Sequence, residues 1–223
     1  RVLFRSVLIQ EGIRDTALEN EIRKKQIPVK VLCRKKMDQL LNGNHQGIAA
    51  SIDDYKTWEL EELLEAIPQG KQPLLVMLDG LEDPHNLGAI LRTCDCIGAD
   101  GVIIGKHRNV RLTPTVAKVS TGAIDTVKVS VVTNLAQAIK YLKKQGYWVV
   151  GTDFENSRDY REGQYDVPLV LVIGSEGFGI SSLVKKNCDY CVRLPMEGSV
   201  SSLNASVAAG ILLYQIHAQR HPL

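Results

Sequence analysis

The segment DPHNLGAILR, residues 83–92, follows the apolar run PLLVML (73–78) and the turn-like pair Asp79-Gly80. Pro, His, Asn and Gly in close succession are typical of a chain that leaves a buried strand and begins a helix. Asn86 and Arg92 then lie six residues apart near the start of that helix. Taken alone, these two residues have an ordinary structural explanation, in which Asn86 caps the helix and Arg92 faces the solvent.

Residues 74–223 continue this alternation of short apolar runs and helical segments. Strands are predicted at PLLVML, GVIIG, DTVKV, YWVVGTD and PLVLVIG, with helix-like segments between most of them. A long helix rich in small residues is predicted over SLNASVAAGILLYQIHAQR (202–220). Near-continuous apolar strands joined by helices predict an α/β fold with a mostly parallel sheet and helices on both faces.

Residues 1–66 show a different pattern, in which short predicted strands alternate with polar helices. Strands are predicted over 2–9, 29–33 and 47–52, and helices over 15–26, 34–41 and 58–67. Asp15 or Thr16 is a plausible N-cap of the first helix, and Asn42-Gly43 closes the second. Because PQGKQP (68–73) is typical of a linker, we predict a small α/β module over 1–66, a linker over 67–73 and a larger domain over 74–223.

The length and composition of the chain limit the classes of protein to which it can belong. The chain has 223 residues, of which 44% are hydrophobic, enough for a proper core in one large or two modest domains. Its net charge of +2 neither indicates nor excludes nucleic-acid binding. No apolar run approaches the roughly 20 residues that span a membrane, and no signal peptide is visible. We therefore expect a cytoplasmic protein with no membrane association.

The five cysteines have no framework spacing, which favours a reducing compartment. Cys94, Cys96, Cys188 and Cys191 could in principle supply four thiolates to zinc. The first pair lies in a predicted helix, where residues two apart point away from one another. We therefore expect buried thiols and no metal site.

Three predicted strands end in polar or glycine-rich segments: DGLEDPHNLGAILR, GSEGFGIS (174–181) and PMEGSVSSLNAS (195–206). Ligands in parallel α/β sheets gather at the carboxyl ends of strands, so we expect these segments to share a crevice. The glycine spacing of the second segment matches neither a dinucleotide-binding motif nor a P-loop. Tight turns and helix caps are the simple alternatives for each segment alone.

Together, DPHNLGAILR, IGSEGFG and LPMEGSVSSLNASVAAGILLY resemble, in order and spacing, the three motifs of the SpoU/TrmH branch of the SPOUT RNA methyltransferases. The resemblance extends from Leu74 to the end, and the fit to the bacterial 23S rRNA guanosine 2′-O-methyltransferase subgroup is close. HQGIAA (45–50) is similar to the last strand of the family's small substrate-binding module. The family's usual opening pattern, Gly-Arg/Lys-Asn/His-x-Val, is not found in this sequence.

The resemblance implies a deep C-terminal trefoil knot that binds S-adenosylmethionine, and methyl transfer to a ribose 2′-hydroxyl without a metal. It implies that Arg92 is the central catalytic residue. Since a guanidinium stays charged in proteins, we interpret Arg92 as a phosphate clamp that stabilises the developing alkoxide, because base action would need strong local perturbation. His85 is a less favoured candidate base.

The other residues that match the motifs have supporting roles. Four of them are implied to orient Arg92 or the ribose, to hold the substrate, or to accept a proton. They are Asn86, Glu176, Ser202 and Asn204. Those implied to bind the cofactor, largely by backbone groups, are Gly174, Leu194, Met196, Ser201 and Leu203.

Candidate RNA contacts are two groups of basic residues, although each group is more often a solvated face. They are Arg23, Lys24, Lys25, Arg34, Lys35 and Lys36 in the first module, and Lys106, His107, Arg108 and Arg111 in the second.

The resemblance also implies a homodimer through the C-terminal domain. The leading interpretation is a methyltransferase acting on 23S rRNA; a tRNA methyltransferase and a non-catalytic RNA-binding or ribosome-assembly factor are the alternatives.

Overall fold

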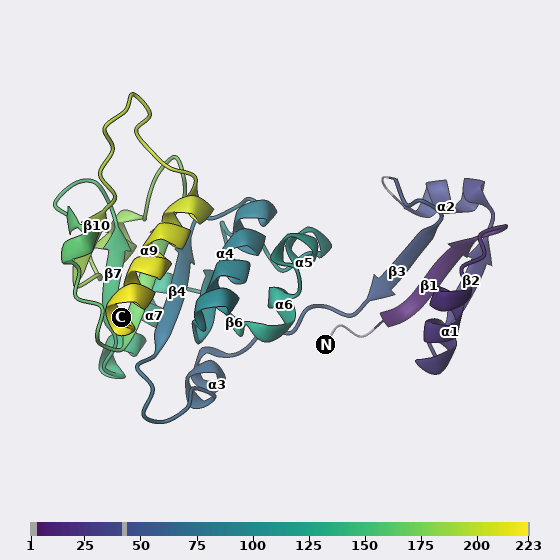
Figure 1. The fold of residues 1–223 in the computed structure, drawn as a ribbon, viewed down its shortest axis with the longest axis horizontal. Helices are drawn as coiled ribbons and strands as arrows, with labels where there is room; N and C mark the ends of the chain where they lie inside the picture. Colours follow the sequence, from purple (N-terminus) through teal and green to yellow (C-terminus); the bar gives the residue numbers. More distant parts are fainter. Residues whose placement is uncertain (1–3, 42–43, 223) are drawn as a thin grey trace. The chain divides into compact units, whose positions relative to one another are not determined.

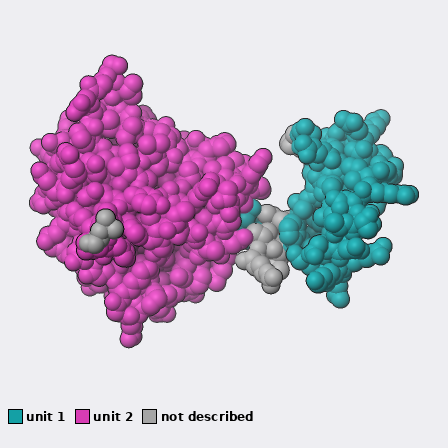
Figure 2. Space-filling view, in the orientation of Figure 1, with its two compact units in different colours: residues 1–55 teal, residues 56–223 magenta. Residues whose placement is uncertain are grey.

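The structure, a computed structural model, describes residues 4–41 and 44–222. The chain divides into two compact units, residues 1–55 (unit 1) and 56–223 (unit 2), which Figure 2 distinguishes by colour. Each unit has a sheet and helices of its own (Figure 1).

Unit 1 is built on a three-stranded sheet. Its central strand β1 (Phe4–Gln10) pairs in parallel with β2 (Val29–Leu32) and antiparallel with β3 (Ile48–Ile52). The helices are α1 (Thr16–Lys24) and α2 (Arg34–Leu40).

A local sequence signal explains where helix α1 begins. The Asp15 side chain accepts a hydrogen bond from the Leu18 N–H at 3.0 Å, so the predicted N-cap of α1 is confirmed. Val7 and Ile9 of β1 pack against Ile22 of α1 to form a small core. The predicted end of α2 at 42–43 lies outside the described residues.

Unit 2 contains a sheet of seven strands in the order β6-β5-β4-β9-β7-β10-β8, in which all paired neighbours run parallel. The strands are β4 (Leu74–Asp79), β5 (Gly101–Gly105), β6 (Val129–Val132), β7 (Trp148–Thr152), β8 (Arg158–Asp159), β9 (Leu169–Gly174) and β10 (Tyr190–Arg193). The predicted parallel sheet is confirmed. The strand expected at DTVKV is displaced, because residues 123–126 form a short helix and β6 begins only at Val129.

Helices cover both faces of this sheet. They are α3 (Leu60–Glu65), α4 (Pro84–Ile97), α5 (Pro114–Ser120), α6 (Ala123–Thr126), α7 (Leu135–Lys144), α8 (Ser182–Lys185) and α9 (Ala205–Arg220), with a 3₁₀ turn, η1 (Tyr160–Glu162). Helices α4 and α9 lie side by side on one face (Figure 1). On the other face, Leu63 of α3, Ile139 of α7 and Val184 of α8 join a core with Met77 and Val172 of the strands.

The two units divide earlier in the chain than the expected linker at 67–73. The Trp58 N–H donates to the Val129 carbonyl at 2.8 Å, which aligns this segment beside β6. Leu60 and Leu63 of α3 are then buried in the core of unit 2. The helix assigned to the first module from sequence therefore packs with unit 2, where its apolar face finds a partner.

The cysteines only partly follow the expectation of buried thiols. Cys94 and Cys191 are buried and Cys188 is half-buried, but Cys96 is exposed. Two residues apart on α4, Cys94 and Cys96 point to different sides of the helix, and only one of those sides faces the sheet. Within the described ranges, no helix is long and apolar enough to cross a membrane.

The trefoil knot stays a prediction, because strand order and register do not report how the chain threads through its own loops.

Candidate active site

The carboxyl ends of β4 and β9 lie next to each other, with Asp79 paired to Gly174. After β4 the chain turns at Gly80, whose φ of 75° favours glycine, and enters α4. The Asp83 carboxylate caps α4 by accepting the His85 N–H at 2.8 Å. This entry places Asn86 in the first turn of α4, where it is only 6% exposed.

The turn after β9 is closed by a pair of backbone hydrogen bonds. The Ser175 N–H donates to the Gly179 carbonyl at 3.1 Å, and the Gly179 N–H donates back to the Ser175 carbonyl at 2.9 Å. A Cβ on Gly174 would come within 2.1 Å of the Gly179 carbonyl carbon, so the turn needs glycine there. The Ser181 N–H donates to the Asp79 carboxylate at 2.7 Å and ties the turn to β4.

Three side chains from distant parts of the sequence meet at this edge, and we call them the Asn86–Glu176–Asn204 cluster. Glu176 Oε1 accepts hydrogen bonds from Asn86 Nδ2 at 2.9 Å, Asn204 Nδ2 at 2.5 Å and the Ala205 N–H at 3.2 Å. Asn204 Nδ2 also donates to Asn86 Oδ1 at 2.9 Å. The carboxylate thus lies at the N-terminus of α9, where the helix dipole favours negative charge.

The orientation of Asn204 is fixed from its other side. Its Oδ1 caps α9 by accepting the backbone N–H groups of Ser206 and Val207. This cap explains why α9 begins at Ala205 rather than at Ser202, where the sequence pattern placed its start. Each amide of the cluster is therefore held in a single orientation by the polar groups around it.

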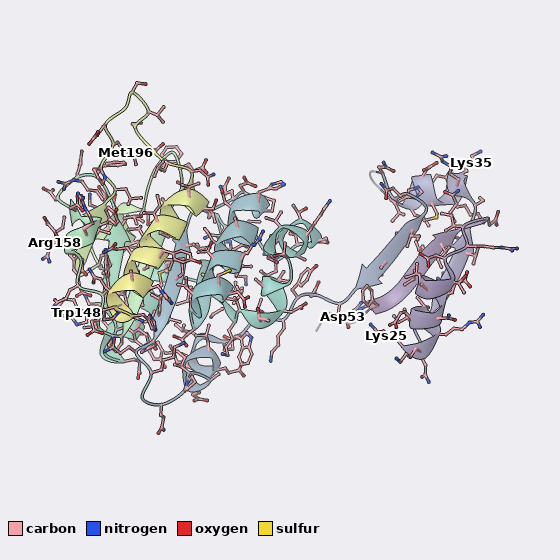
Figure 3. All side chains as sticks on the ribbon, viewed as in Figure 1. Lys25, Lys35, Asp53, Trp148, Arg158 and Met196 are labelled. Atoms are coloured by element: carbon pink, nitrogen blue, oxygen red, sulfur yellow. The ribbon has the colours of Figure 1, made fainter. Side chains whose placement is uncertain are left out.

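A cavity of about 380 Å³ borders the cluster. The ends of β7, β9 and β10 line it, together with the loop 194–204, which projects beyond α9 and carries Met196 (Figures 1 and 3). All five residues expected to bind the cofactor line this cavity: Gly174, Leu194, Met196, Ser201 and Leu203. Glu176 and Ser202 line it as well. A largely apolar slot with a few polar groups suits a flat ligand that needs some hydrogen bonds.

Arg92 lies outside this arrangement. Its side chain is exposed, does not line the cavity, and makes no hydrogen bond or ion pair with any residue in the described ranges. Six residues after Asn86 correspond to roughly 240° of rotation around the helix, so the two side chains leave α4 in different directions. His85 is exposed and lies 3.1 Å from the Asp83 carboxylate through Nδ1. The structure brings Asn86, Glu176 and Asn204 together but does not join Arg92 to them.

Several cavity-lining residues were not predicted from sequence: Asp153, Phe154, Phe178 and Arg193. Asp153 follows β7 directly and pairs with Lys185 at 2.8 Å. Arg193 lies at the end of β10 in the same way. The signal that could have identified both residues is their position at the carboxyl end of an apolar strand.

The candidate RNA-binding groups of unit 1 do not form one patch. Lys25 and Lys35, which represent the two groups, lie at opposite ends of the unit (Figure 3). In unit 2, Lys106, His107, Arg108 and Arg111 are exposed in the segment after β5. As for metals, the part of the chain that the structure describes has no group of three or more His, Cys, Asp or Glu placed to hold an ion.

Comparison with known proteins finds that the chain is similar to RNA-modifying enzymes. A model described as the SpoU rRNA Methylase family matches residues 73–214, and one described as RNA 2′-O ribose methyltransferase substrate binding matches residues 1–58. YacO of Bacillus subtilis, assigned by its name to the TrmH family of tRNA/rRNA methyltransferases, is 50% identical over 226 residues. That match covers 100% of this chain and 91% of YacO.

Two solved structures are similar as well. The SpoU methyltransferase AviRb from Streptomyces viridochromogenes, in complex with AdoMet, is 26% identical with a TM-score of 0.79, over 98% of this chain and 84% of AviRb. The A. aeolicus TrmH/SpoU tRNA modifying enzyme is 32% identical with a TM-score of 0.63, over 72% of this chain and 82% of that one.

Proposed function

Because the chain belongs to the SpoU rRNA methylase family, we propose that it methylates the ribose 2′-hydroxyl of a guanosine in 23S rRNA. It is an RNA methyltransferase of the kind that takes its methyl group from S-adenosylmethionine. One observation carries the proposal: the Asn86–Glu176–Asn204 cluster borders the cavity at the carboxyl edge of the parallel sheet. The choice of rRNA is supported by the family description, and the substrate-binding model that matches residues 1–58 supports methylation of an RNA ribose 2′-oxygen.

The cavity is the proposed cofactor site. S-adenosylmethionine supplies a methyl group that is already activated on a sulfonium sulfur. The side chains of Leu194, Met196 and Leu203 offer an apolar slot for a flat base, and Ser201 offers a hydroxyl. Gly174 lines the cavity at the end of β9, and its lack of a side chain lets the Gly179 backbone close the turn against the strand.

Glu176 is the proposed acceptor of the proton that leaves the ribose hydroxyl. Its Oε1 already accepts three hydrogen bonds, whereas no described residue donates to Oε2. Oε2 is therefore the oxygen left to face a substrate in the cavity. Asn86 and Asn204 position the carboxylate, and Ser202, which also lines the cavity, is proposed to hold the ribose.

Arg92 is proposed to act on the RNA rather than on the cluster. Its guanidinium is exposed and has no partner among the described residues, so it is available to a phosphate beside the target ribose. In that position it would stabilise the negative charge that develops on the 2′-oxygen. The basic groups of unit 1 and of the segment after β5 would add salt-dependent attraction to the RNA backbone.

We also propose a homodimer through unit 2. Helix α9 exposes three large apolar side chains at helical spacing: Val207 (49% exposed), Ile211 (38%) and Tyr214 (55%). A two-fold axis would bury the same stripe on both copies. The opposite, inward side of α9 is already buried through Leu213 and Ile216, so the stripe is surplus to the fold of unit 2.

The experiment that tests the function is methyl transfer from methyl-labelled S-adenosylmethionine to unmodified 23S rRNA and to bulk tRNA. We expect label on the 2′-oxygen of one guanosine in 23S rRNA. Label in tRNA alone would keep the chemistry and overturn the substrate; the 32% identity to a tRNA modifying enzyme makes this the alternative to test. Bound cofactor with no transfer to either RNA would overturn the proposal.

A further inference from the structure

The chain contains only three phenylalanines, and two of them, Phe154 and Phe178, line the cavity of the proposed active site. Phe178 is 97% exposed, the highest exposed fraction among the large hydrophobic side chains that the structure describes. A Phe ring is among the side chains that gain most from leaving water, so a ring left this open is unusual in a stable fold.

The backbone around Phe178 holds the ring outward. Phe178 lies in the turn closed by the Ser175 and Gly179 hydrogen-bond pair, and its own N–H donates to Ser175 Oγ at 3.3 Å. The turn is fixed to the sheet by Gly174, which tolerates no side chain, and by the Ser181 bond to Asp79. The exposure is therefore built into a short, tied turn rather than into a long loop.

The reaction restricts what can lie beside this ring. For methyl transfer to a ribose, the target 2′-hydroxyl must reach the cavity that Glu176 and Phe178 both line. The base attached to that ribose then lies near the mouth of the cavity, and when it is unpaired its flat face is free to meet the ring. RNA-binding proteins hold such bases on exposed aromatic faces.

We propose that Phe178 is a stacking platform for an unpaired base at the methylation site. The inference rests on the proposed function and deepens it, since it implies a substrate with a nucleotide splayed out of a loop or bulge. Phe178 is a positioning residue in this account: it orients the nucleotide whose hydroxyl reacts and takes no part in the proton transfer.

The test compares Phe178→Ala, Phe178→Leu and Phe178→Trp with Leu183→Ala as a matched control. Leu183 is also exposed, at 58%, but belongs to α8 and does not line the cavity. The readouts are kcat/KM and filter-binding Kd with an unmodified 23S rRNA transcript, calorimetric Kd for S-adenosylmethionine, and sedimentation.

We expect Phe178→Ala to lower kcat/KM for RNA by about 5- to 150-fold, the range of alanine substitutions at base-stacking residues. Phe178→Trp should stay near wild type, Phe178→Leu should resemble Ala because it lacks a π face, and Leu183→Ala should be neutral. The Kd for S-adenosylmethionine should not change. A series of transcripts should each carry one abasic residue, at or beside the mapped nucleotide. In the transcript that lacks the stacked base, Phe178→Ala should no longer lower kcat/KM relative to wild type.

Four outcomes would overturn the inference while leaving the proposed function intact: near-wild-type activity of Phe178→Ala, a penalty that persists on every abasic transcript, a matching loss of cofactor affinity, or dissociation of a wild-type dimer. The last two would mean that the ring packs on the cofactor or on a second copy of the chain. Failure of the wild-type protein to methylate any RNA would instead overturn the proposed function, and the RNA Kd values would still report on stacking.

Discussion

At the residue scale, a fixed hydrogen-bonded cluster lies on one side of α4 and an exposed arginine on another. Asn86, Glu176 and Asn204 hydrogen-bond to one another before any substrate arrives, and Glu176 Oε2 is left for the substrate. Arg92, on another side of α4, has no such partner among the described residues. The cluster can therefore serve as a rigid wall of the site, whereas Arg92 can adapt to the RNA.

The free position of Arg92 predicts a separation of activity from stability. Arg92→Ala should lower kcat by about 100-fold or more, as loss of a charge-stabilising donor does elsewhere. The free energy of unfolding should change by no more than about 0.5 kcal/mol, because the side chain is exposed and pairs with no residue that the structure describes. Methyl-transfer kinetics and urea denaturation of the same preparations check both parts. Near-native turnover with unchanged RNA binding would show that Arg92 has no catalytic role.

Cys94 predicts a pH dependence of stability. Burial, and secondarily the charge of Asp95, raise the pKa of the Cys94 thiol from 9.0 to about 12. A folded-state pKa above the unfolded one stabilises the fold below pH 9 and loses that contribution as the pH rises from 9 to 12. In urea denaturation, the stability advantage of wild type over Cys94→Ala should therefore shrink across this window. A constant difference would contradict the burial of the thiol.

At the scale of elements, helix entries and strand ends set the geometry. Asp83 begins α4 and Asn204 begins α9, and the second of these caps also donates into the cluster. The turn after β9 supplies the third member, Glu176. Because β4 and β9 are neighbours in the sheet, their loops meet although they are distant in sequence.

The β9 turn predicts a contrast between two glycines. Gly174→Ala would place a Cβ within 2.1 Å of the backbone of Gly179, so the turn must open and the cavity wall must shift. Gly198→Ala places its Cβ more than 4 Å from any described neighbour, has no positive φ and does not line the cavity, so it serves as the matched control. We expect S-adenosylmethionine binding, measured by calorimetry, to be lost in the first variant and retained in the second. Equal binding by both would exclude the turn from the cofactor site.

Many of the strands and helix caps can be predicted from the sequence. The buried strands of unit 2 are near-continuous apolar runs, and the caps at Asp15 and Asn204 are residues that favour such positions. Periodicity shows that a helix has an apolar face, but it does not show which core receives that face. The sequence alone therefore does not show that Leu60 and Leu63 pack in the core of unit 2.

The candidate site was readable only in part, for a similar reason. The motif resemblance identified residues that line the cavity or join the cluster. It could not give the direction in which Arg92 leaves α4, nor the exposure of Phe178, since both depend on how the helix and the turn are fixed to the sheet. Asp153 was missed because a single acidic residue after a strand is a weak signal by itself.

At the scale of the whole molecule, the chain pairs a unit that carries the cavity with a smaller unit that matches an RNA substrate-binding model. The apolar stripe of Val207, Ile211 and Tyr214 on α9 predicts assembly of two copies. Its central position makes Ile211 the residue to change.

Ile211→Arg should convert a dimer to a monomer, because two charges would be buried against each other across a two-fold axis. Leu183→Arg, also an exposed apolar position but on α8, should leave the dimer intact. Sedimentation velocity of wild type and both variants gives the answer. A wild-type monomer, or a dimer that survives Ile211→Arg, would contradict an interface on α9.

The central claim is that the cavity beside the Asn86–Glu176–Asn204 cluster is where methyl transfer takes place. The most direct measurement is a crystal structure of the protein with S-adenosylmethionine. The account predicts cofactor density in the cavity lined by Gly174, Leu194 and Met196, with the methyl group directed toward Glu176. Density elsewhere, such as the hollow between Lys71 and Arg220, or a methyl group directed away from Glu176, would contradict it.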